Sequence, residues 1–335
     1  MSALAPSRCT EHKPRVGFDP LWAPIIGHYR DGRLDRARIA AHVASLAPAL
    51  QQFLIGGTTG DGWQIGEGVL DEWLDLVADP AVLTPEHTVL FGAFAADAAG
   101  VIARARRIEA AIERAPPVCR FAGITLCAPV DAEATPATIE AHLRAVIEAT
   151  SSPIAIYQLP QVTQNLIPTD VLARLVRDTG RIVLFKDTSG EDAIARAGVP
   201  LPGVRLLRGA EGGYAEALLP DGPYDGWLLS TGNGFAPELR AIADGVTAGR
   251  ADASDRSAKL SALVKALFDA AAPHGANAFA DVARAVDHAR AHGRDAARAP
   301  LPERFDATTL SPLLIERTID LLDEAGLGSV AGYLG

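Results

Sequence analysis

The chain has 335 residues, 48% hydrophobic and 21% charged, which suits one large barrel or two ordinary domains with a sizeable core. Its 31 basic and 41 acidic residues give a net charge of −10, and without a basic cluster this balance argues against a nucleic-acid partner. No apolar run reaches the roughly 20 residues of a membrane span, and residues 1–13 lack the apolar core of a signal peptide, so we expect a cytoplasmic protein without a membrane partner.

Eight short apolar segments follow one another along the first two thirds of the chain. They are rich in Ile, Val and Leu, as expected of strands that helices cover on both faces. The predicted strands cover residues 21–26, 52–57, 88–94, 122–128, 153–159, 181–186, 204–208 and 226–230. Between most of them lies an amphipathic stretch of helical period, at residues 38–50, 69–77, 100–115, 135–149, 169–179 and 211–219.

This repeat predicts an α/β protein whose residues 18–236 form a (β/α)8 TIM barrel, preceded by an N-terminal tail at residues 1–17. An open doubly wound sheet is the alternative, because a string of βα units does not say whether the sheet closes. The number of strands favours the barrel, and no Gly-x-Gly-x-x-Gly follows the first strand. The rest of the chain, residues 237–335, predicts a C-terminal helical extension with helices at 237–249, 253–272, 278–292 and 311–326.

Lys186 closes the sixth predicted strand and stands directly before the turn-forming residues 187–190. Burial at a strand end lowers the pKa of an amine and leaves a nucleophile at neutral pH. Because barrel enzymes carry their chemistry at the C-terminal ends of the strands, Lys186 is a candidate for Schiff-base formation. The alternative interpretation is a structural lysine paired with a carboxylate such as Asp187.

Two other strand ends would meet Lys186 at the same mouth. Tyr157 ends the fifth strand, and a phenol both donates and accepts a proton, as carbinolamine formation and breakdown require. A core tyrosine with a satisfied hydroxyl is the alternative. The glycine-rich segment 56–60 places the hydroxyls of Thr58 and Thr59 beside backbone N–H groups, an arrangement suited to a carboxylate, although such a turn is as often structural.

Three motifs, taken together and in this order, resemble those of the dihydrodipicolinate synthase and N-acetylneuraminate lyase superfamily of class I aldolases. They are Gly-Thr-Thr-Gly at 57–60, Tyr-x-x-Pro at 157–160 and Lys-Asp-Thr-Ser-Gly at 186–190. The resemblance runs from about residue 18 to residue 237. It implies a (β/α)8 barrel with a C-terminal helical region, a homo-oligomer (dimer or tetramer), a small 2-keto acid as the bound partner, and no metal or organic cofactor.

The resemblance also implies roles for individual residues. Lys186 would form an imine with the keto carbon of pyruvate or another 2-keto acid, and Tyr157 would transfer the proton. Thr58 would serve catalysis as well as binding, since it would hold the carboxylate beside the reacting carbon. The residues that would bind the substrate are Thr58, Thr59, Gly57 and Leu228, the last as an apolar residue near the bound pyruvate.

Three departures from the family pattern lie beyond the imine centre. Val162 stands where the synthases have an arginine that binds the substrate carboxylate, and an apolar side chain cannot replace a bidentate guanidinium. Val130 and Asp131 replace two tyrosines, the second of which completes a proton relay across a subunit interface. Asp61 replaces a glutamate. These changes affect the substrate more directly than the imine chemistry.

We therefore predict a Schiff-base lyase or aldolase that acts on pyruvate or a 2-keto(-3-deoxy) acid. A 2-keto-3-deoxy sugar acid dehydratase would use the same imine. A 4-hydroxy-tetrahydrodipicolinate synthase needs another basic residue for the carboxylate. A catalytically weak member that binds a keto acid is the alternative from a different class.

A metal-dependent aldolase is a further alternative. It would need metal ligands, for which the histidines are the candidates. His288 and His292 are four residues apart on a predicted helix, but no glutamate completes a zinc-protease pattern, and we expect them on a solvated face. His28 and Tyr29 follow the first predicted strand, Arg208 and Glu211 lie near the end of the seventh, and all four are additional candidates for contact with the substrate.

Overall fold

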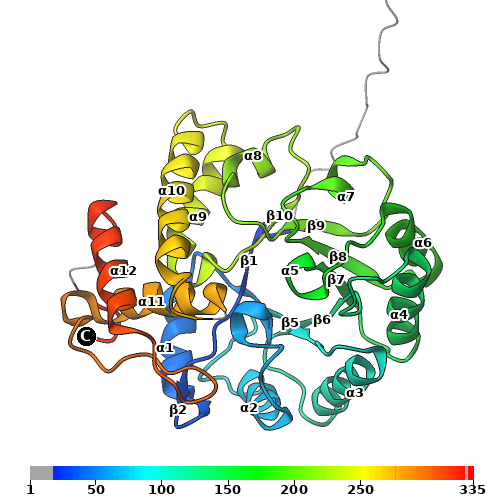
Figure 1. Ribbon diagram of the computed structural model, residues 1–335, viewed down its shortest axis with the longest axis horizontal. Helices are drawn as coiled ribbons and strands as arrows, with labels where there is room; N and C mark the ends of the chain where they lie inside the picture. The colour runs from blue at the N-terminus through cyan, green and yellow to red at the C-terminus, as the bar shows by residue number, and fades with distance from the viewer. Residues whose placement is uncertain (1–17, 276, 329–330) are drawn as a thin grey trace, which may run out of the picture.

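The computed structural model describes residues 18–275, 277–328 and 331–335, so the predicted tail at residues 1–17 lies outside the described residues. Eight parallel strands close into a barrel in the order β1-β10-β9-β8-β7-β6-β5-β4 (Figure 1). The predicted barrel is thus confirmed, and the open sheet is excluded. The barrel strands are β1 (Leu21–Pro24), β4 (Gln52–Ile55), β5 (Thr88–Gly92), β6 (Arg120–Cys127), β7 (Ile154–Gln158), β8 (Ile182–Asp187), β9 (Arg205–Arg208) and β10 (Gly226–Leu228).

Five long helices connect the first six barrel strands and cover the outside of the barrel (Figure 1). Asp35, Asp97 and Thr135 each start a helix, because the side chain accepts a hydrogen bond from the backbone N–H three residues later. The five helices are α1 (Arg36–Leu46), α2 (Glu67–Val77), α3 (Ala98–Arg114), α4 (Pro136–Glu148) and α6 (Thr169–Thr179).

The remaining short elements lie between the barrel strands. Only short helices follow β8 and β9, and α10 packs against α8 on that side. A two-stranded hairpin after β1 and a turn of helix after β7 were not predicted, since each is too short to show a period. These elements are β2 (Tyr29–Arg30), β3 (Arg33–Leu34), η1 (Thr58–Gly60), α5 (Pro160–Thr163), α7 (Ala193–Arg196) and α8 (Tyr214–Leu218).

The lower interior of the barrel is an apolar layer formed by inward-pointing side chains, namely Trp22, Leu54, Leu90, Ala155, Leu184, Leu207 and Leu228. Successive side chains of a strand alternate between its two faces. The next inward positions are therefore Tyr157 above Ala155 on β7 and Lys186 above Leu184 on β8. The register of these neighbouring strands pairs Tyr157 with Lys186.

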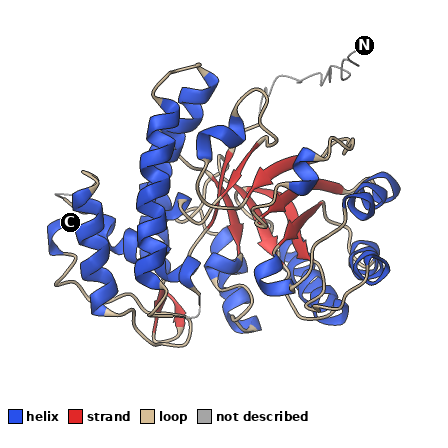
Figure 2. Ribbon diagram, turned by 45° about the horizontal axis from the view of Figure 1, so that its top comes forward, coloured by secondary structure: helices blue, strands red, loops and turns tan. Residues whose placement is uncertain are grey.

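The C-terminal helices gather on one side of the barrel (Figure 2). Helix α11 contacts η1 at the barrel mouth as well as the helices on either side of it in the chain. No helix among the described residues is both long enough and apolar enough to cross a bilayer. The four helices are α9 (Gly232–Thr247), α10 (Ala253–Ala271), α11 (Ala278–His292) and α12 (Pro312–Glu324).

Candidate active site

Lys186 lies inside the barrel at the end of β8, with 4% of its surface exposed. Burial lowers the pKa of its amine to about 7, although the charges of Glu211 and Cys127 act in the opposite direction. A large fraction of the amine is therefore neutral near pH 7. Neutral amine is the form that attacks a carbonyl carbon.

Two neighbours explain how the lysine fits without a bonded carboxylate. Asp187, the partner that a structural lysine would need, instead accepts hydrogen bonds from Gln158 Nε2 (3.1 Å) and Ser189 N–H (2.8 Å). Gly209 follows β9 and lies against the lysine side chain. A Cβ atom at position 209 would stand 2.5 Å from Lys186 Cε, so only glycine leaves room for the lysine there.

Tyr157 lies beside the amine, with 4.0 Å between Lys186 Nζ and the centroid of its ring. Burial raises the pKa of the Tyr157 phenol, so it carries its proton at neutral pH, while the nearby hydroxyls of Thr188 and Thr58 lower that pKa. Among the described residues, neither threonine hydroxyl has a hydrogen-bond partner. Buried polar groups without a partner are uncommon, and these two lie near the Tyr157 phenol.

The predicted threonine loop is the single turn η1 at the mouth of the barrel. Thr59 is buried, and the Thr58 hydroxyl is shielded from solvent. Gly57 packs closely, since a Cβ atom there would lie 2.9 Å from Pro24 Cβ. Asn277, which precedes α11, donates from Nδ2 to the Thr58 carbonyl oxygen at 2.8 Å.

Asp61 fixes the other end of this loop in a left-handed conformation with φ of 57°. Its carboxylate is buried and forms an ion pair with Arg284 of α11, whose side chain is also buried. The Tyr29 hydroxyl donates to the same carboxylate at 3.1 Å. Asp61, which stands where the family has a glutamate, therefore links the threonine loop at the barrel mouth to helix α11.

Glu211 is a positioned carboxylate near the amine. It accepts hydrogen bonds from Ser230 Oγ (2.6 Å), Thr231 N–H (3.1 Å), Thr231 Oγ1 (2.5 Å) and the Tyr214 hydroxyl (3.0 Å). Four donors hold the carboxylate in place, and its charge raises the pKa of Lys186. The sequence marked Glu211 only as a candidate, because its partners come from α8 and from the residues after β10.

An apolar rim packs against Tyr157. Trp63 stacks on Phe94 with 5.1 Å between ring centroids, and Phe94 lies 6.1 Å from the Tyr157 ring centroid. Val162 packs against the same cluster. Sequence reasoning missed both aromatic residues, because Trp63 lies in a glycine-rich turn and Phe94 ends an ordinary apolar run. We define the apolar rim as Trp63, Phe94, Leu159 and Val162.

The other predicted residues are distributed over three places. Leu228 lies in the apolar layer within the barrel, and its role beside a substrate stays a prediction. Asp131 is exposed and accepts a hydrogen bond from Glu133 N–H. Arg208 donates to Ala210 O (2.7 Å), which is a structural contact.

Two of the histidines singled out in the sequence, His28 and His288, are buried. The prediction of a solvated face was wrong for His288, which is 3% exposed and bonded through Nε2 to Ala296 O at 2.8 Å. The chain folds back over α11 after residue 292 and covers this histidine. His28 packs against His42 beside the C-terminal helices, with 3.1 Å between ring nitrogens.

Comparisons with known proteins agree with this architecture. The model of the dihydrodipicolinate synthetase family matches residues 120–296, slightly more than half of the chain. A search of curated proteins finds no match. KD(P)GA from T. tenax is 22% identical with a TM-score of 0.69, and the match covers 92% of this chain and 99% of that one.

Two more solved structures share the fold. A prophage protein of the dihydrodipicolinic acid synthase family from E. coli K12, in complex with pyruvate, has a TM-score of 0.71 at 18% identity, over 91% of this chain and 98% of its own. The 2-keto-3-deoxygluconate aldolase of Sulfolobus solfataricus, in complex with D-KDPG, has a TM-score of 0.70 at 16% identity, over 91% and 96%. At such identities the likeness establishes the fold alone.

Proposed function

This chain belongs to the dihydrodipicolinate synthetase family, and from that membership we propose that it is a Schiff-base lyase or aldolase acting on pyruvate or another 2-keto acid. The observation that carries the proposal is the buried amine of Lys186, whose pKa is lowered to about 7 at a distance of 4.0 Å from the Tyr157 ring centroid. A neutral amine beside a protonated phenol supplies the two groups that imine formation needs.

The reaction follows from these two groups. The Lys186 amine attacks the keto carbon while the carbonyl oxygen takes a proton from Tyr157, which gives a carbinolamine. The phenolate then recovers a proton from the nitrogen and donates one to the departing hydroxyl, which leaves as water. The protonated imine accepts electrons, so that a C–C bond beta to it is cleaved, or an enamine attacks an aldehyde in the reverse direction.

The substrate carboxylate would bind at the threonine loop. Thr58 and Thr59 offer hydroxyl groups there, and the Thr58 hydroxyl lacks a well-aligned partner in the described chain. A carboxylate that accepts hydrogen bonds from these groups would place its keto carbon toward Lys186. This arrangement gives Thr58 its proposed part in both binding and catalysis, with Gly57 and Leu228 as packing neighbours.

The apolar rim guides the choice of substrate. Val162 lies within this rim, so the carboxylate of an aspartate semialdehyde would find no guanidinium at this position. We therefore favour cleavage of a 2-keto acid, including a 2-keto-3-deoxy acid, over lysine biosynthesis. Relatives solved with pyruvate and with D-KDPG share this fold, and so do dihydrodipicolinate synthases, so the choice of class rests on Val162. A dehydratase would use the same imine.

A second candidate is a keto-acid-binding protein with little turnover. The exposed position of Asp131 favours it, because the proton relay would then end at Tyr157. This protein would form the imine but release the keto acid unchanged.

The test is intact-mass analysis after incubation with pyruvate and sodium borohydride, followed by peptide mapping. A single reduced adduct on Lys186 is expected, and folded protein that acquires no adduct with pyruvate or with longer 2-keto acids contradicts the imine mechanism. A screen of 2-keto-3-deoxy acids for pyruvate release then separates the enzyme from the binding protein. Because the natural state is expected to be a homo-oligomer, the assays use the full chain at micromolar concentration.

A further inference from the structure

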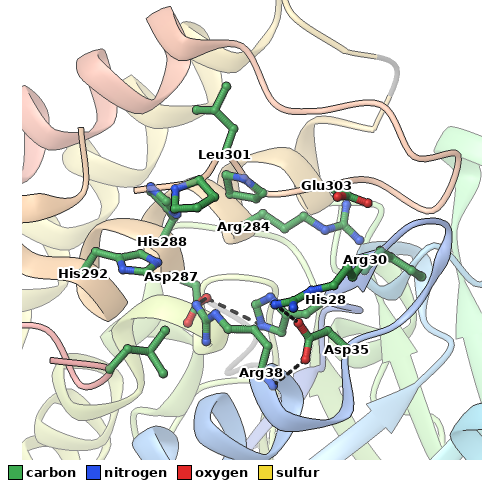
Figure 3. Close-up of a pocket in the computed structure, with 14 residues that line it drawn as sticks. His28, Arg30, Asp35, Arg38, Arg284, Asp287, His288, His292, Leu301 and Glu303 are labelled. Carbon is green, nitrogen blue, oxygen red and sulfur yellow. Dashed lines mark hydrogen bonds and ion pairs between the residues drawn. The ribbon is translucent and has the colours of Figure 1, made fainter. Parts of the chain in front are cut away.

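A cavity of about 220 Å³ lies between the loop after β1, helix α1 and helix α11 (Figure 3). Neither Lys186 nor any residue of the apolar rim lines it. The three arginines of its lining are each ion-paired, namely Arg30 with Asp35, Arg38 with Asp287 and Arg284 with Asp61. The groups that can distinguish one 2-keto acid from another therefore lie at the barrel mouth, around Lys186.

One half of the barrel mouth is apolar. The members of the apolar rim follow the C-terminal ends of three strands: Trp63 follows β4, Phe94 follows β5, and Leu159 and Val162 follow β7. Cys127, the last residue of β6, packs in the same cluster. Parallel strands of a barrel end at one face, so the rim lies at the same face as the threonine loop. The four consecutive strands β4 to β7 thus carry apolar side chains at the mouth.

The rim has no side-chain acceptor for a substrate hydroxyl. Its one polar side-chain atom is Trp63 Nε1, which is a donor. Two of its backbone carbonyl groups are engaged as well, since Phe94 O accepts from Arg104 Nη1 (3.0 Å) and Leu159 O accepts from Thr163 Oγ1 (3.0 Å). A polyhydroxylated chain placed against the rim would bury hydroxyl groups without partners, which is unfavourable.

The other half of the mouth is polar, but most of its hydrogen bonds are made within the protein. Glu211 follows β9, and a carboxylate has about four acceptor positions, which its four donors fill. Ser230 and Thr231 use their hydroxyl protons for this carboxylate. Thr188 has a hydroxyl without a partner among the described residues. The mouth therefore favours a substrate with a hydroxyl near the reacting carbon and an apolar body beyond it.

We propose that the natural substrate is a 4-hydroxy-2-keto acid whose chain beyond C4 is apolar instead of polyhydroxylated. This inference rests on the proposed function and narrows it to one class of 2-keto acid. With the carboxylate at the threonine loop and the keto carbon at Lys186, the apolar end of the chain would pack against the rim. Val162, which stands where the synthases have an arginine, then contributes to the surface that selects this substrate.

Cleavage of such a substrate needs no reagent besides water. In the imine with Lys186, the C4 hydroxyl gives up its proton, the electron pair of the C3–C4 bond moves to the imine, and C4 leaves as the carbonyl carbon of an apolar aldehyde. The enamine that remains takes up a proton at C3, and water then hydrolyses the imine to pyruvate and the free amine.

The test is a competition between two six-carbon acids, 2-oxohexanoate and 2-keto-3-deoxygluconate, trapped on the full chain with sodium borohydride. Intact mass measures the two adducts, and a pyruvate adduct is counted with the sugar acid, whose cleavage would produce it. The ratio is divided by that obtained with Nα-acetyllysine, which corrects for ring closure of the sugar acid. It is expected to favour 2-oxohexanoate by at least about fivefold, because the end of its chain leaves water. A smaller ratio overturns this inference.

A matched pair of valine variants locates the preference. Val162→Thr keeps the shape of the side chain but adds a hydroxyl to the rim, and it is expected to lower the corrected ratio by at least about threefold. Val199→Thr makes the same change at a position that is 39% exposed and outside the rim, and it should leave the ratio in place. An unchanged ratio in Val162→Thr overturns the assignment of the preference to the rim.

Failure of this inference is distinguishable from failure of the proposed function. Folded protein that forms no adduct with pyruvate or with either longer acid contradicts the imine mechanism, and this inference with it. Adducts of both acids on Lys186 at a corrected ratio below about fivefold leave the imine mechanism in place and overturn this inference alone.

Discussion

Two regions of this molecule bury charge in opposite ways. At the barrel mouth, Lys186 is enclosed without a bonded carboxylate, and Thr58 and Thr188 have hydroxyls without a well-aligned partner. At the junction with α11, Asp61 is ion-paired with Arg284. At this junction the two buried charges are paired, so the ion pair holds the threonine loop against α11. Among the described residues, the mouth leaves these two hydroxyls unsatisfied, which costs stability but keeps them available to a substrate.

Replacing the lysine gives the largest expected effect on activity. Lys186→Met removes the nucleophile, so adduct formation with pyruvate should vanish and turnover should fall by at least about 10³-fold. Turnover with 2-keto acids and borohydride trapping measure both effects. Full turnover in this variant would falsify the mechanism.

The same variant tests the cost of burying the amine. The pKa of Lys186 is about 7 in the folded protein against 10.5 for a free lysine, so the unfolded chain binds the proton more tightly. Stability of the natural protein should therefore rise as the pH increases from about 7 toward 10.5. The stability of Lys186→Met should not rise over this pH range, and at pH 7 it should be at least equal to that of the natural protein. Urea unfolding of both proteins at pH 7 and pH 9 measures the two differences.

Breaking the junction should cost stability instead. Arg284→Met leaves the Asp61 carboxylate buried without its cation, which is expected to lower the free energy of unfolding by about 3–5 kcal/mol. The exposed pair of Arg317 and Glu324 provides the control. Arg317→Met should change the free energy of unfolding by less than about 1 kcal/mol. Equal losses in the two variants would contradict the distinction drawn between buried and exposed pairs.

The phenol at the mouth is expected to act in proton transfer. Tyr157→Phe keeps the ring beside Phe94 but removes the hydroxyl, so turnover should fall by about 10²-fold with little change in the midpoint of thermal unfolding. Tyr224→Phe is the control, because its hydroxyl donates to Asp192 (2.7 Å) and serves structure. That variant should lose about 1 kcal/mol of stability and keep its turnover.

The close fit of the lysine provides a smaller test. Gly209→Ala places a Cβ 2.5 Å from Lys186 Cε, so the side chain must move, at a cost of about 1–3 kcal/mol and with slower adduct formation. Gly68→Ala in α2 meets no atom within 4 Å and should be neutral or stabilising. Unchanged trapping kinetics in Gly209→Ala would show that the lysine does not need this glycine.

The smallest expected effect concerns the charge of Glu211. That charge raises the pKa of Lys186, so Glu211→Gln should lower it further and move the midpoint of the pH profile for adduct formation to lower pH. The free energy involved is roughly 1 kcal/mol. Glu238→Gln, which removes a carboxylate paired with Arg290, should leave the midpoint in place. A midpoint that shifts equally in both variants would argue against a specific effect of the Glu211 charge on Lys186.

The barrel could be predicted from sequence because its strands are local patterns. Each strand is a short apolar run between turn residues, and the helices show a clear period. Lys186 and Tyr157 stood out for a related reason, since each is a polar residue at the end of such a run. The structure brings them together through the register of two adjacent strands.

The junction could not be predicted in this way. Asp61 and Arg284 are 223 residues apart, and Asn277 lies 219 residues from the carbonyl it binds. Periodicity says nothing about which residues meet over such separations. His288 illustrates the limit, because an alanine-rich helix with polar residues around it resembles a surface helix until the following segment folds over it.

The Asp61–Arg284 pair also bears on how chains of this kind can be recombined. A chimera that takes residues 57–61 from one relative and α11 from another separates the carboxylate from its guanidinium, and the Thr58 carbonyl from its amide donor. Crossover points anywhere between positions 61 and 277 have this result. In this chain the threonine loop and α11 therefore have to be exchanged together.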